Sequence, residues 1–222
     1  MIYITGDCHS DFVRFNKENF PEQREMTKDD YVIICGDFGG VWNVDEESKR
    51  ESWWMDWKGG KVHKVRPSVI HLMRGQVYQI DGKKIFTFGG ASSHDISGGI
   101  LEPDDPDYKR KKKELDHGWL PYRINRVSWW KQELPSKAEM EEGLKNLSVH
   151  GNTVDFIVSH CCSSSTQALL GGGLFTPDVL TNYLEQIRQT VTFKKWFFGH
   201  YHDNKNVNAD EILLYEQLIR IS

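Results

Sequence analysis

The start of the chain places two potential metal ligands directly after an apolar run. Residues 1–5 are apolar or β-branched, Gly6 follows, and Asp7 and His9 come next. This pattern predicts a strand that ends at the carboxyl edge of a sheet, where open α/β sheets build their sites. A carboxylate and an imidazole two residues apart can both reach one divalent cation.

The same design recurs at three later strands. The apolar run 31–35 leads into Gly36-Asp37, the run 154–158 leads into Ser159-His160, and the run 193–198 leads into Gly199-His200-Tyr201-His202. Four strand ends therefore supply six candidate metal ligands, which are Asp7, His9, Asp37, His160, His200 and His202. A mixture of carboxylate and imidazole suits Mn²⁺, Fe or Zn²⁺ better than Mg²⁺ or Ca²⁺, which prefer all-oxygen shells.

Taken in order, these motifs resemble those of the calcineurin-like metallophosphoesterases. The matching motifs are Asp7-x-His9, Gly36-Asp37, the lone His160 and Gly199-His200-x-His202, and they cover essentially the whole chain. The resemblance implies an α/β (α+β) fold in which a two-sheet β-sandwich is flanked by helices, as one domain over residues 1–222. It implies two divalent cations, with Mn²⁺ as the first expectation and Fe or Zn²⁺ as alternatives.

The family pattern also implies a role for each ligand. Asp7, His9 and His202 would hold one cation, His160 and His200 would hold the other, and Asp37 would bridge the two. A water between two cations can attack a phosphate in line, so no covalent nucleophile is needed. The expected activity is hydrolysis of a small phosphomonoester or phosphodiester.

One family motif is missing from this chain. No Gly-Asn-His-Asp/Glu occurs between Asp37 and His160, and Gly151-Asn152 precedes a strand instead of following one. Residues 40–67 are predicted to hold one tryptophan-rich helix and little else, as if a unit of one strand and one helix were lacking. The resemblance implies that the missing histidine would protonate the leaving group or hold the phosphate, and loss of general-acid help alone costs on the order of 10² to 10⁴ in rate. The chain is therefore expected to bind metal but to be catalytically weakened.

Other residues could substitute for the missing motif. Asn43, His63, His71 and His94 are the candidates, although none lies in a family motif. His94 belongs to the glycine-rich loop 89–95, which could overlook the strand ends. His94 is therefore the candidate catalytic residue.

Further elements follow from periodicity, caps and turns. The expected helices and strands are a helix over 11–20 closed by Pro21, a tryptophan-rich helix over 44–57, a strand over 69–73, a hairpin over 77–88 with Asp81-Gly82 at its turn, a helix after the capping box at Ser136, a helix after Thr176-Pro177, and one or two strands over 212–221. The lysine-rich run 109–113 is expected to be a solvated helix face, because Glu114 and Asp116 accompany it.

Composition limits the partners that the chain can have. A net charge of −4 gives no global attraction for nucleic acid. No apolar run approaches the roughly 20 residues of a membrane span, and no charged leader with a cleavage site is visible. The four cysteines lack the spacing of a disulfide framework or a zinc site and are expected to fill the core. A cytoplasmic protein is the resulting expectation.

Three alternatives remain beside the phosphoesterase. The chain could be a catalytically inactive metal-binding or regulatory protein of the same fold, or a nuclease of that fold. A zinc protein held by cysteines is the most distant alternative. The sequence does not fix the substrate, and a homodimer would cover the apolar surface that a lost unit would expose.

Overall fold

A six-stranded mixed sheet forms the centre of the structure, a computed structural model that describes residues 1–40 and 53–222. In spatial order its strands are β12 (Lys205–Asn206), β13 (Glu211–Leu213), β11 (Lys195–Phe198), β10 (Phe156–Ser159), β7 (Lys83–Phe88) and β6 (Gln76–Ile80). The four inner strands are parallel, and β12 and β6 pair antiparallel at the two edges. The carboxyl ends of β10 and β11 therefore lie side by side.

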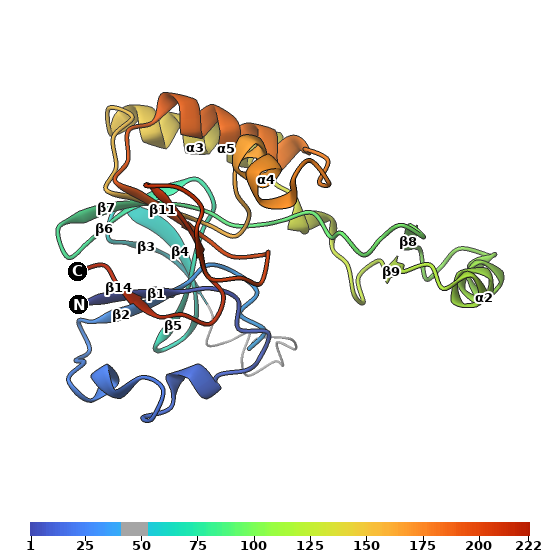
Figure 1. The fold of residues 1–222 in the computed structure, drawn as a ribbon, viewed down its shortest axis with the longest axis horizontal. Coiled ribbons are helices and arrows are strands. Elements are labelled where there is room, and N and C mark those ends of the chain that lie inside the picture. The colour runs from blue at the N-terminus through green and yellow to red at the C-terminus, as the bar shows by residue number, and fades with distance from the viewer. Residues whose placement is uncertain (41–52) are drawn as a thin grey trace.

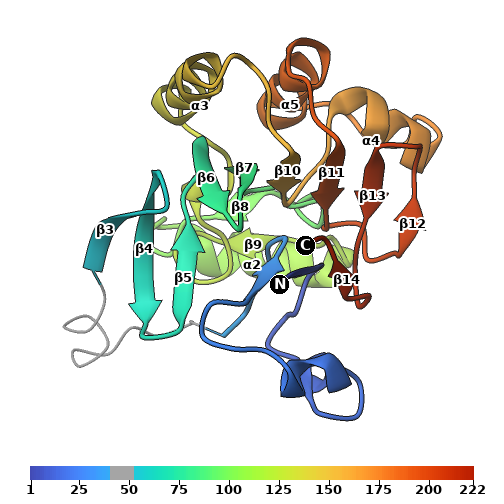
Figure 2. The same ribbon diagram turned by 90° about the vertical axis from the view of Figure 1, so that its left-hand side faces the viewer.

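Three helices cover one face of this sheet (Figure 2). They are α3 (Lys137–Val149), α4 (Ser164–Gly171) and α5 (Val179–Thr190). The apolar stripe of α5, which includes Leu184 and Ile187, packs into one core cluster with Phe86 and Trp196 of the sheet. Burial of this stripe stabilises the layer, since each fully buried large apolar side chain contributes about 1.5–3 kcal/mol.

Two three-stranded sheets lie against the other face. One contains β14 (Ile219–Arg220), β1 (Ile2–Thr5) and β2 (Tyr31–Ile34), and the other contains β3 (Trp53–Trp57), β4 (Gly60–Arg66) and β5 (Val69–Leu72). Ile4 of β1 and Val62 of β4 share a second core cluster with Val158 and Phe197. Alternate residues of β10 and β11 thus face opposite layers, as the period of two in a strand requires.

The remaining elements are short or lie away from the sheets. They are the 3-10 turns η1 (Val13–Phe15), η2 (Pro21–Arg24) and η3 (Lys131–Glu133), the strand pair β8 (Ile100–Leu101) and β9 (Arg123–Ile124), and the helix α2 (Tyr108–Gly118). Figure 1 shows α2, β8 and β9 on an extension that projects from the layered body. Within the described residues, no helix is long and apolar enough to cross a membrane.

The mixed α/β architecture predicted from the sequence is confirmed, and so are several of its elements. β2, β5, the β6–β7 hairpin, β10 and β11 lie where strands were expected. The capping box of α3 forms, because Ser136 accepts the Glu139 N–H and Glu139 accepts the Ser136 N–H. The lysine run of α2 is a solvated helix face that includes ion pairs to Glu114 and Asp116. All four cysteines are buried and free.

The helix predicted over residues 11–20 is wrong. This segment contains only the 3-10 turn η1, and a second turn, η2, follows at Pro21. The Asn16 side chain accepts the N–H groups of Glu18 and Asn19 at 2.9 and 2.7 Å. These local bonds satisfy the backbone in a turn, so they compete with a continuous helix.

The tryptophan-rich helix predicted over residues 44–57 is wrong where it can be compared. Residues 53–57 form the strand β3, which pairs antiparallel with β4 across a turn at Lys58 and Gly59. Residues 44–52 lie outside the described part of the chain. Asn43, one of the proposed substitutes for the missing motif, also lies outside it. The expectation that residues 40–67 hold little besides a helix is therefore also wrong, because two paired strands occupy 53–66.

The structure also changes the region around α4 and α5. Helix α5 begins two residues later than predicted, since Asp178 caps it and forms a capping box with Thr181. Helix α4 was not predicted from the sequence. Its signals were present: Ser163 caps the Thr166 N–H, and Gly172 ends the helix in the left-handed conformation.

Candidate metal centre

Asp7 is the buried centre of the candidate site. It follows β1 and Gly6, and its exposed fraction is 0%. Its carboxylate accepts the backbone N–H of His200 at 2.9 and 3.2 Å. The Asp7 carbonyl accepts from the Arg14 guanidinium at 2.6 Å, which fixes the loop behind the carboxylate. No lysine or arginine side chain forms an ion pair with this carboxylate among the described residues.

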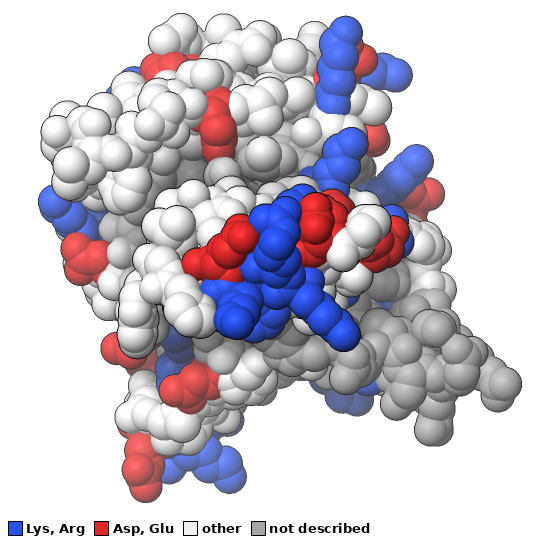
Figure 3. Space-filling view, turned by 90° about the vertical axis from the view of Figure 1, so that its right-hand side faces the viewer, with Lys and Arg blue, Asp and Glu red and all other residues white. Residues whose placement is uncertain are grey.

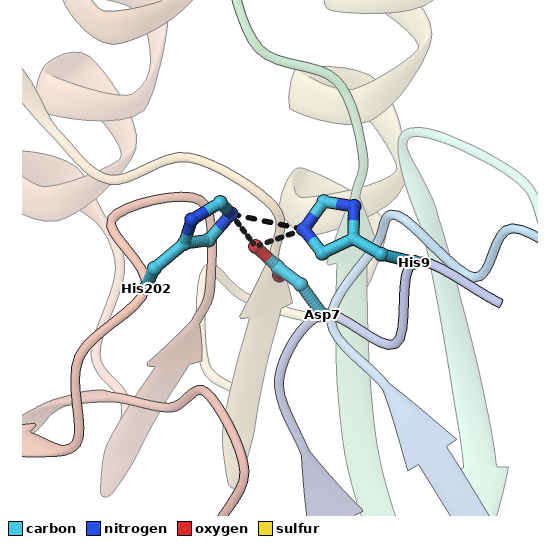
Figure 4. Close-up of side chains that lie close together, drawn as sticks. All are labelled: Asp7, His9 and His202. Carbon is cyan, nitrogen blue, oxygen red and sulfur yellow. Dashed lines mark hydrogen bonds and ion pairs between the residues drawn. The ribbon is translucent and has the colours of Figure 1, made fainter. Parts of the chain in front are cut away.

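His9 and His202 converge on one oxygen of Asp7 (Figure 4). The His202 Nε2 lies 3.4 Å and the His9 Nε2 lies 3.9 Å from Asp7 Oδ2. The two Nε2 atoms are 2.9 Å apart. Ligands at about 2.1 Å from one ion in a tetrahedral shell are roughly 3.4 Å apart. The three atoms are therefore spaced as one cation would require.

His160 and Asp37 form a second group with Asp7. The His160 Nδ1 lies 3.0 Å from the carbonyl oxygen of Cys35, which can only accept, so this nitrogen carries the proton. Its other nitrogen, Nε2, lies 3.7 Å from Asp37 Oδ2. Metal-bound histidines commonly donate their second ring N–H to a backbone carbonyl in this way. Asp37 Oδ2 also lies 3.7 Å from His9 Nδ1, so Asp37 stands between the two groups.

His200 adjoins the second group through its ring. The centroids of the His200 and His160 rings are 5.1 Å apart, at an interplanar angle of 68°. Burial lowers the pKa of His200 to about 3, and the neighbouring His160 and His94 add to the effect. The ring is therefore neutral at physiological pH, which is the form that binds a cation. His200 is not among the residues whose ligand atoms all lie within 4.8 Å of one another.

His94 reaches the same place from the glycine-rich loop. Its ring centroid lies 5.6 Å from that of His200, and the ring is solvent-exposed. The other proposed substitutes are elsewhere: His63 and His71 are cross-strand partners on β4 and β5, and they belong to neither ligand group. Of the described candidates for the missing motif, only His94 lies beside the cluster.

Close approach at two glycines explains the Gly-Asp and Gly-His motifs. A Cβ at Gly36, where φ is +126°, would overlap the His160 ring. A Cβ at Gly199 would overlap the Asp7 carboxylate. Several ligands also have left-handed backbone, with φ of 47° at His9, 37° at Asp37, 72° at His200 and 49° at His202. Such conformations are costly for non-glycine residues and concentrate at functional sites.

Burial makes Asp7 an unfavourable place for an uncompensated charge. It raises the pKa of the Asp7 carboxyl, while the nearby His160 acts in the opposite direction. A cation held by the carboxylate would compensate this cost. The donor types, their spacing and the burial of Asp7 thus fit a divalent cation bound at Asp7. The Asp7 carboxylate belongs both to the group with His9 and His202 and to the group with Asp37 and His160.

Three aromatic or cationic residues around the site escaped the sequence analysis. Arg14 supports the Asp7 loop, and the Tyr215 ring stacks on His202 with centroids 4.9 Å apart. The Tyr201 hydroxyl lies 3.3 Å from the Cys161 sulfur and accepts from Gln167 Nε2 at 3.1 Å. Only Tyr201 carried a sequence signal, its place between His200 and His202.

Comparison with protein-family models, with curated proteins and with solved structures gave no match. The assignment of the site therefore depends on its residues and their geometry.

Proposed function

We propose that this protein is a metal-dependent phosphoric ester hydrolase whose centre is organised around Asp7. The observation that carries the proposal is the fully buried Asp7 carboxylate, which takes part in both ligand groups. One carboxylate shared between two clusters of imidazole and carboxylate ligands favours two cations placed a few ångströms apart.

The arrangement of layers supports the same proposal. Two small sheets face the six-stranded sheet across one core cluster, and helices cover its far side, which resembles a β-sandwich flanked by helices. The ligands come from the ends of β1, β2, β10 and β11, in the chain order of the calcineurin-like metallophosphoesterases. We propose that the chain is a divergent member of that family.

The proposed ligands divide by position. With the shared Asp7, His9 and His202 would hold one cation, and Asp37 and His160, with His200 beside them, would hold the other. Two cations, with Mn²⁺ first and Fe or Zn²⁺ as alternatives, would neutralise phosphate oxygens and lower the pKa of a water between them. The substrate class is a phosphomonoester or phosphodiester.

The missing Gly-Asn-His motif leaves the second group with fewer ligands. In the described residues it comprises Asp37, His160 and the shared Asp7, with His200 next to it. His94 is exposed and near His200, so it is the residue placed to protonate a leaving group or contact the phosphate. Because the second group has few ligands, it also favours a second candidate function, that of a metal-binding regulatory protein with little or no turnover.

Hydrolysis of p-nitrophenyl phosphate and bis-p-nitrophenyl phosphate with added Mn²⁺ tests the proposal. We expect slow but metal-dependent turnover by the full chain, abolished in Asp7→Asn. His94→Ala should lower kcat by about 10² or more if His94 supplies the proton, while His117→Ala, an exposed histidine on α2, should not. Binding of Mn²⁺ without turnover of either ester would favour the regulatory protein instead.

A further inference from the structure

One long segment of the chain has no hydrophobic core of its own. From residue 102 to residue 134, which we call the arm, no residue is buried. Figure 1 shows α2, β8 and β9 extending away from the sheets, with α2 at the tip. The arm is nevertheless regular in conformation, since α2 runs for 11 residues and ends with Trp119 in the left-handed conformation.

Within a single chain, α2 is held mainly by local polar contacts, whereas the arm joins the body near its end, where Leu134 packs against the core and Arg74 donates to the Gln132 carbonyl. On α2, Arg110 forms ion pairs with Asp107 and Glu114 at 3.1 and 2.9 Å, and Lys112 pairs with Asp116 at 2.9 Å. Such exposed pairs contribute only about 0.2–1 kcal/mol each. Isolated helices shorter than about 12–15 residues are marginal in water. The ordered arm therefore lacks the buried surface that normally offsets the loss of chain entropy.

The arm also exposes large apolar side chains. The exposed fractions are 92% for Trp119, 63% for Val127, 47% for Leu120 and 41% for Trp130. Single exposed apolar residues are ordinary, but several of them on one projecting segment mark an interaction surface. Tryptophan is also among the residues most enriched at the energetic centre of protein interfaces.

The charges of the arm are of both signs and nearly balanced. It contains eight lysines and arginines and seven aspartates and glutamates, so it does not form a field that would select a polyanion. Figure 3, which views the molecule from the side of α2, shows the cationic and anionic side chains next to each other. Lys109, Lys113 and Asp104 form no ion pair within the described residues. Charges of both signs that form no ion pair on one segment are what a contact between two copies of that segment requires.

We propose that the arm is a dimerisation element that packs against the arm of a second copy of this chain. In an isologous contact, both copies contribute the same patch, so that residue i of one copy meets residue j of the other and residue j meets residue i. Such a patch must be complementary to itself. A stable interface takes roughly 20 to 30 residues from each partner, which the arm has the length to supply. Trp119 and Leu120 form the apolar centre of the contact, and the unpaired charges of Lys109, Lys113 and Asp104 form its rim.

Sedimentation equilibrium of the full chain tests this surface. We expect a dimer. Trp119→Ser should raise its dissociation constant by at least about 30-fold, because loss of a tryptophan at the centre of an interface has an effect of this size. The matched control is Trp54→Ser, which removes a tryptophan that is 66% exposed on the edge strand β3 of the body. The control should leave the dimer unchanged. Circular dichroism of both variants excludes unfolding as the cause.

Charge exchange tests the isologous geometry without removing apolar surface. The double variant Lys109→Glu/Lys113→Glu and the single variant Asp104→Lys should each dimerise less well than the unmodified chain. Mixed together, they should recover at least part of the affinity, because each altered patch meets an opposite charge on the other chain. A monomeric full chain at about 100 µM would overturn the proposal. A dimer that Trp54→Ser disrupts and Trp119→Ser does not would also overturn it.

Discussion

The loops that carry the proposed metal ligands, here called the ligand loops, and the arm are stabilised in opposite ways. The loops around Asp7 are packed so tightly that a single Cβ at Gly199 or Gly36 would overlap a ligand. The arm has no buried residue over 102–134, and its helix depends on exposed ion pairs. Both are connecting segments by chain position, yet the layered core anchors the loops throughout and the arm only near its end, at Leu134.

This difference indicates where the fold can sustain unfavourable groups. The left-handed ligands His9, Asp37, His200 and His202 and the buried Asp7 each cost free energy. The strands that carry these loops, β1, β2, β10 and β11, are packed into the two core clusters, and this packing compensates for the cost. The part of the arm around α2 has no buried residue to support it within one chain, which is the reason for expecting a second copy.

Truncation of one leucine in each region should give the largest contrast. Leu184 is fully buried on the inner face of α5, and Leu184→Ala should cost about 2–5 kcal/mol of unfolding free energy. Leu120 on the arm is 47% exposed, and Leu120→Ala should cost less than about 0.5 kcal/mol in the dilute monomer. Urea unfolding at low protein concentration measures both. Equal losses would mean that the arm is part of the core after all.

Glycine replacement should separate the ligand loops from ordinary loops. In Gly199→Ala the new Cβ would displace the Asp7 carboxylate, so we expect a loss of about 1–3 kcal/mol together with weaker metal binding. Gly89→Ala is the control, because no atom beyond its two chain neighbours lies within 4 Å of its added Cβ. Thermal unfolding and metal titration report the two effects. A Gly199→Ala variant that binds metal normally would show that the loops are not rigid.

The ion pair at the base of the arm should have the smallest effect. Arg123 contacts both oxygens of Asp95 at 2.9 and 2.6 Å, and it holds the pKa of that carboxyl below its ordinary value. Both side chains are more than a third exposed, so Asp95→Asn should cost about 0.2–1 kcal/mol.

The pH dependence of this ion pair follows from the sign of the shift. A lowered carboxyl pKa stabilises the fold above the ordinary carboxyl pKa, and this contribution is lost as the pH falls through the lowered value. The difference between wild type and Asp95→Asn should thus begin to shrink as the pH falls below about 4 and disappear once the pH is below the lowered pKa. Unfolding free energies measured from pH 7 to pH 3 check this, and a difference that grows toward low pH would refute the assignment of Arg123 as the partner.

Strand ends were the part of this protein that the sequence could predict. An apolar run indicates a buried strand. Where a glycine ends the strand, the residue that follows the glycine lies at the edge of the sheet. Parallel neighbours bring those edges together, as β10 and β11 do with His160 and His200. In the same way, the parallel pair β1 and β2 brings Asp7 and His9 beside Asp37. The two pairs of strands belong to different sheets, and the packing of one sheet on the other brings all these residues together.

Long-range contacts decided what the sequence could not. Trp53–Trp57 is a strand because Gly60–Arg66 returns beside it, and no periodicity within five residues indicates that partner. His94 reaches His200 across a loop whose course depends on the whole body. The exposure of the arm was equally hidden, because α2 has the sequence of any solvated helix and its separation from the sheets is a tertiary property.

Calorimetric titration of Mn²⁺ tests the central claim, that Asp7 is shared by both ligand groups. The account predicts that the full chain binds Mn²⁺ and that Asp7→Asn weakens all binding by at least about 100-fold. His9→Ala should impair only one group, and Asp210→Asn, an exposed aspartate outside both groups, should impair neither. Metal-free Asp7→Asn should melt no lower than wild type at pH 7, because burial raises the pKa of Asp7. Unchanged Mn²⁺ binding by Asp7→Asn would contradict the account.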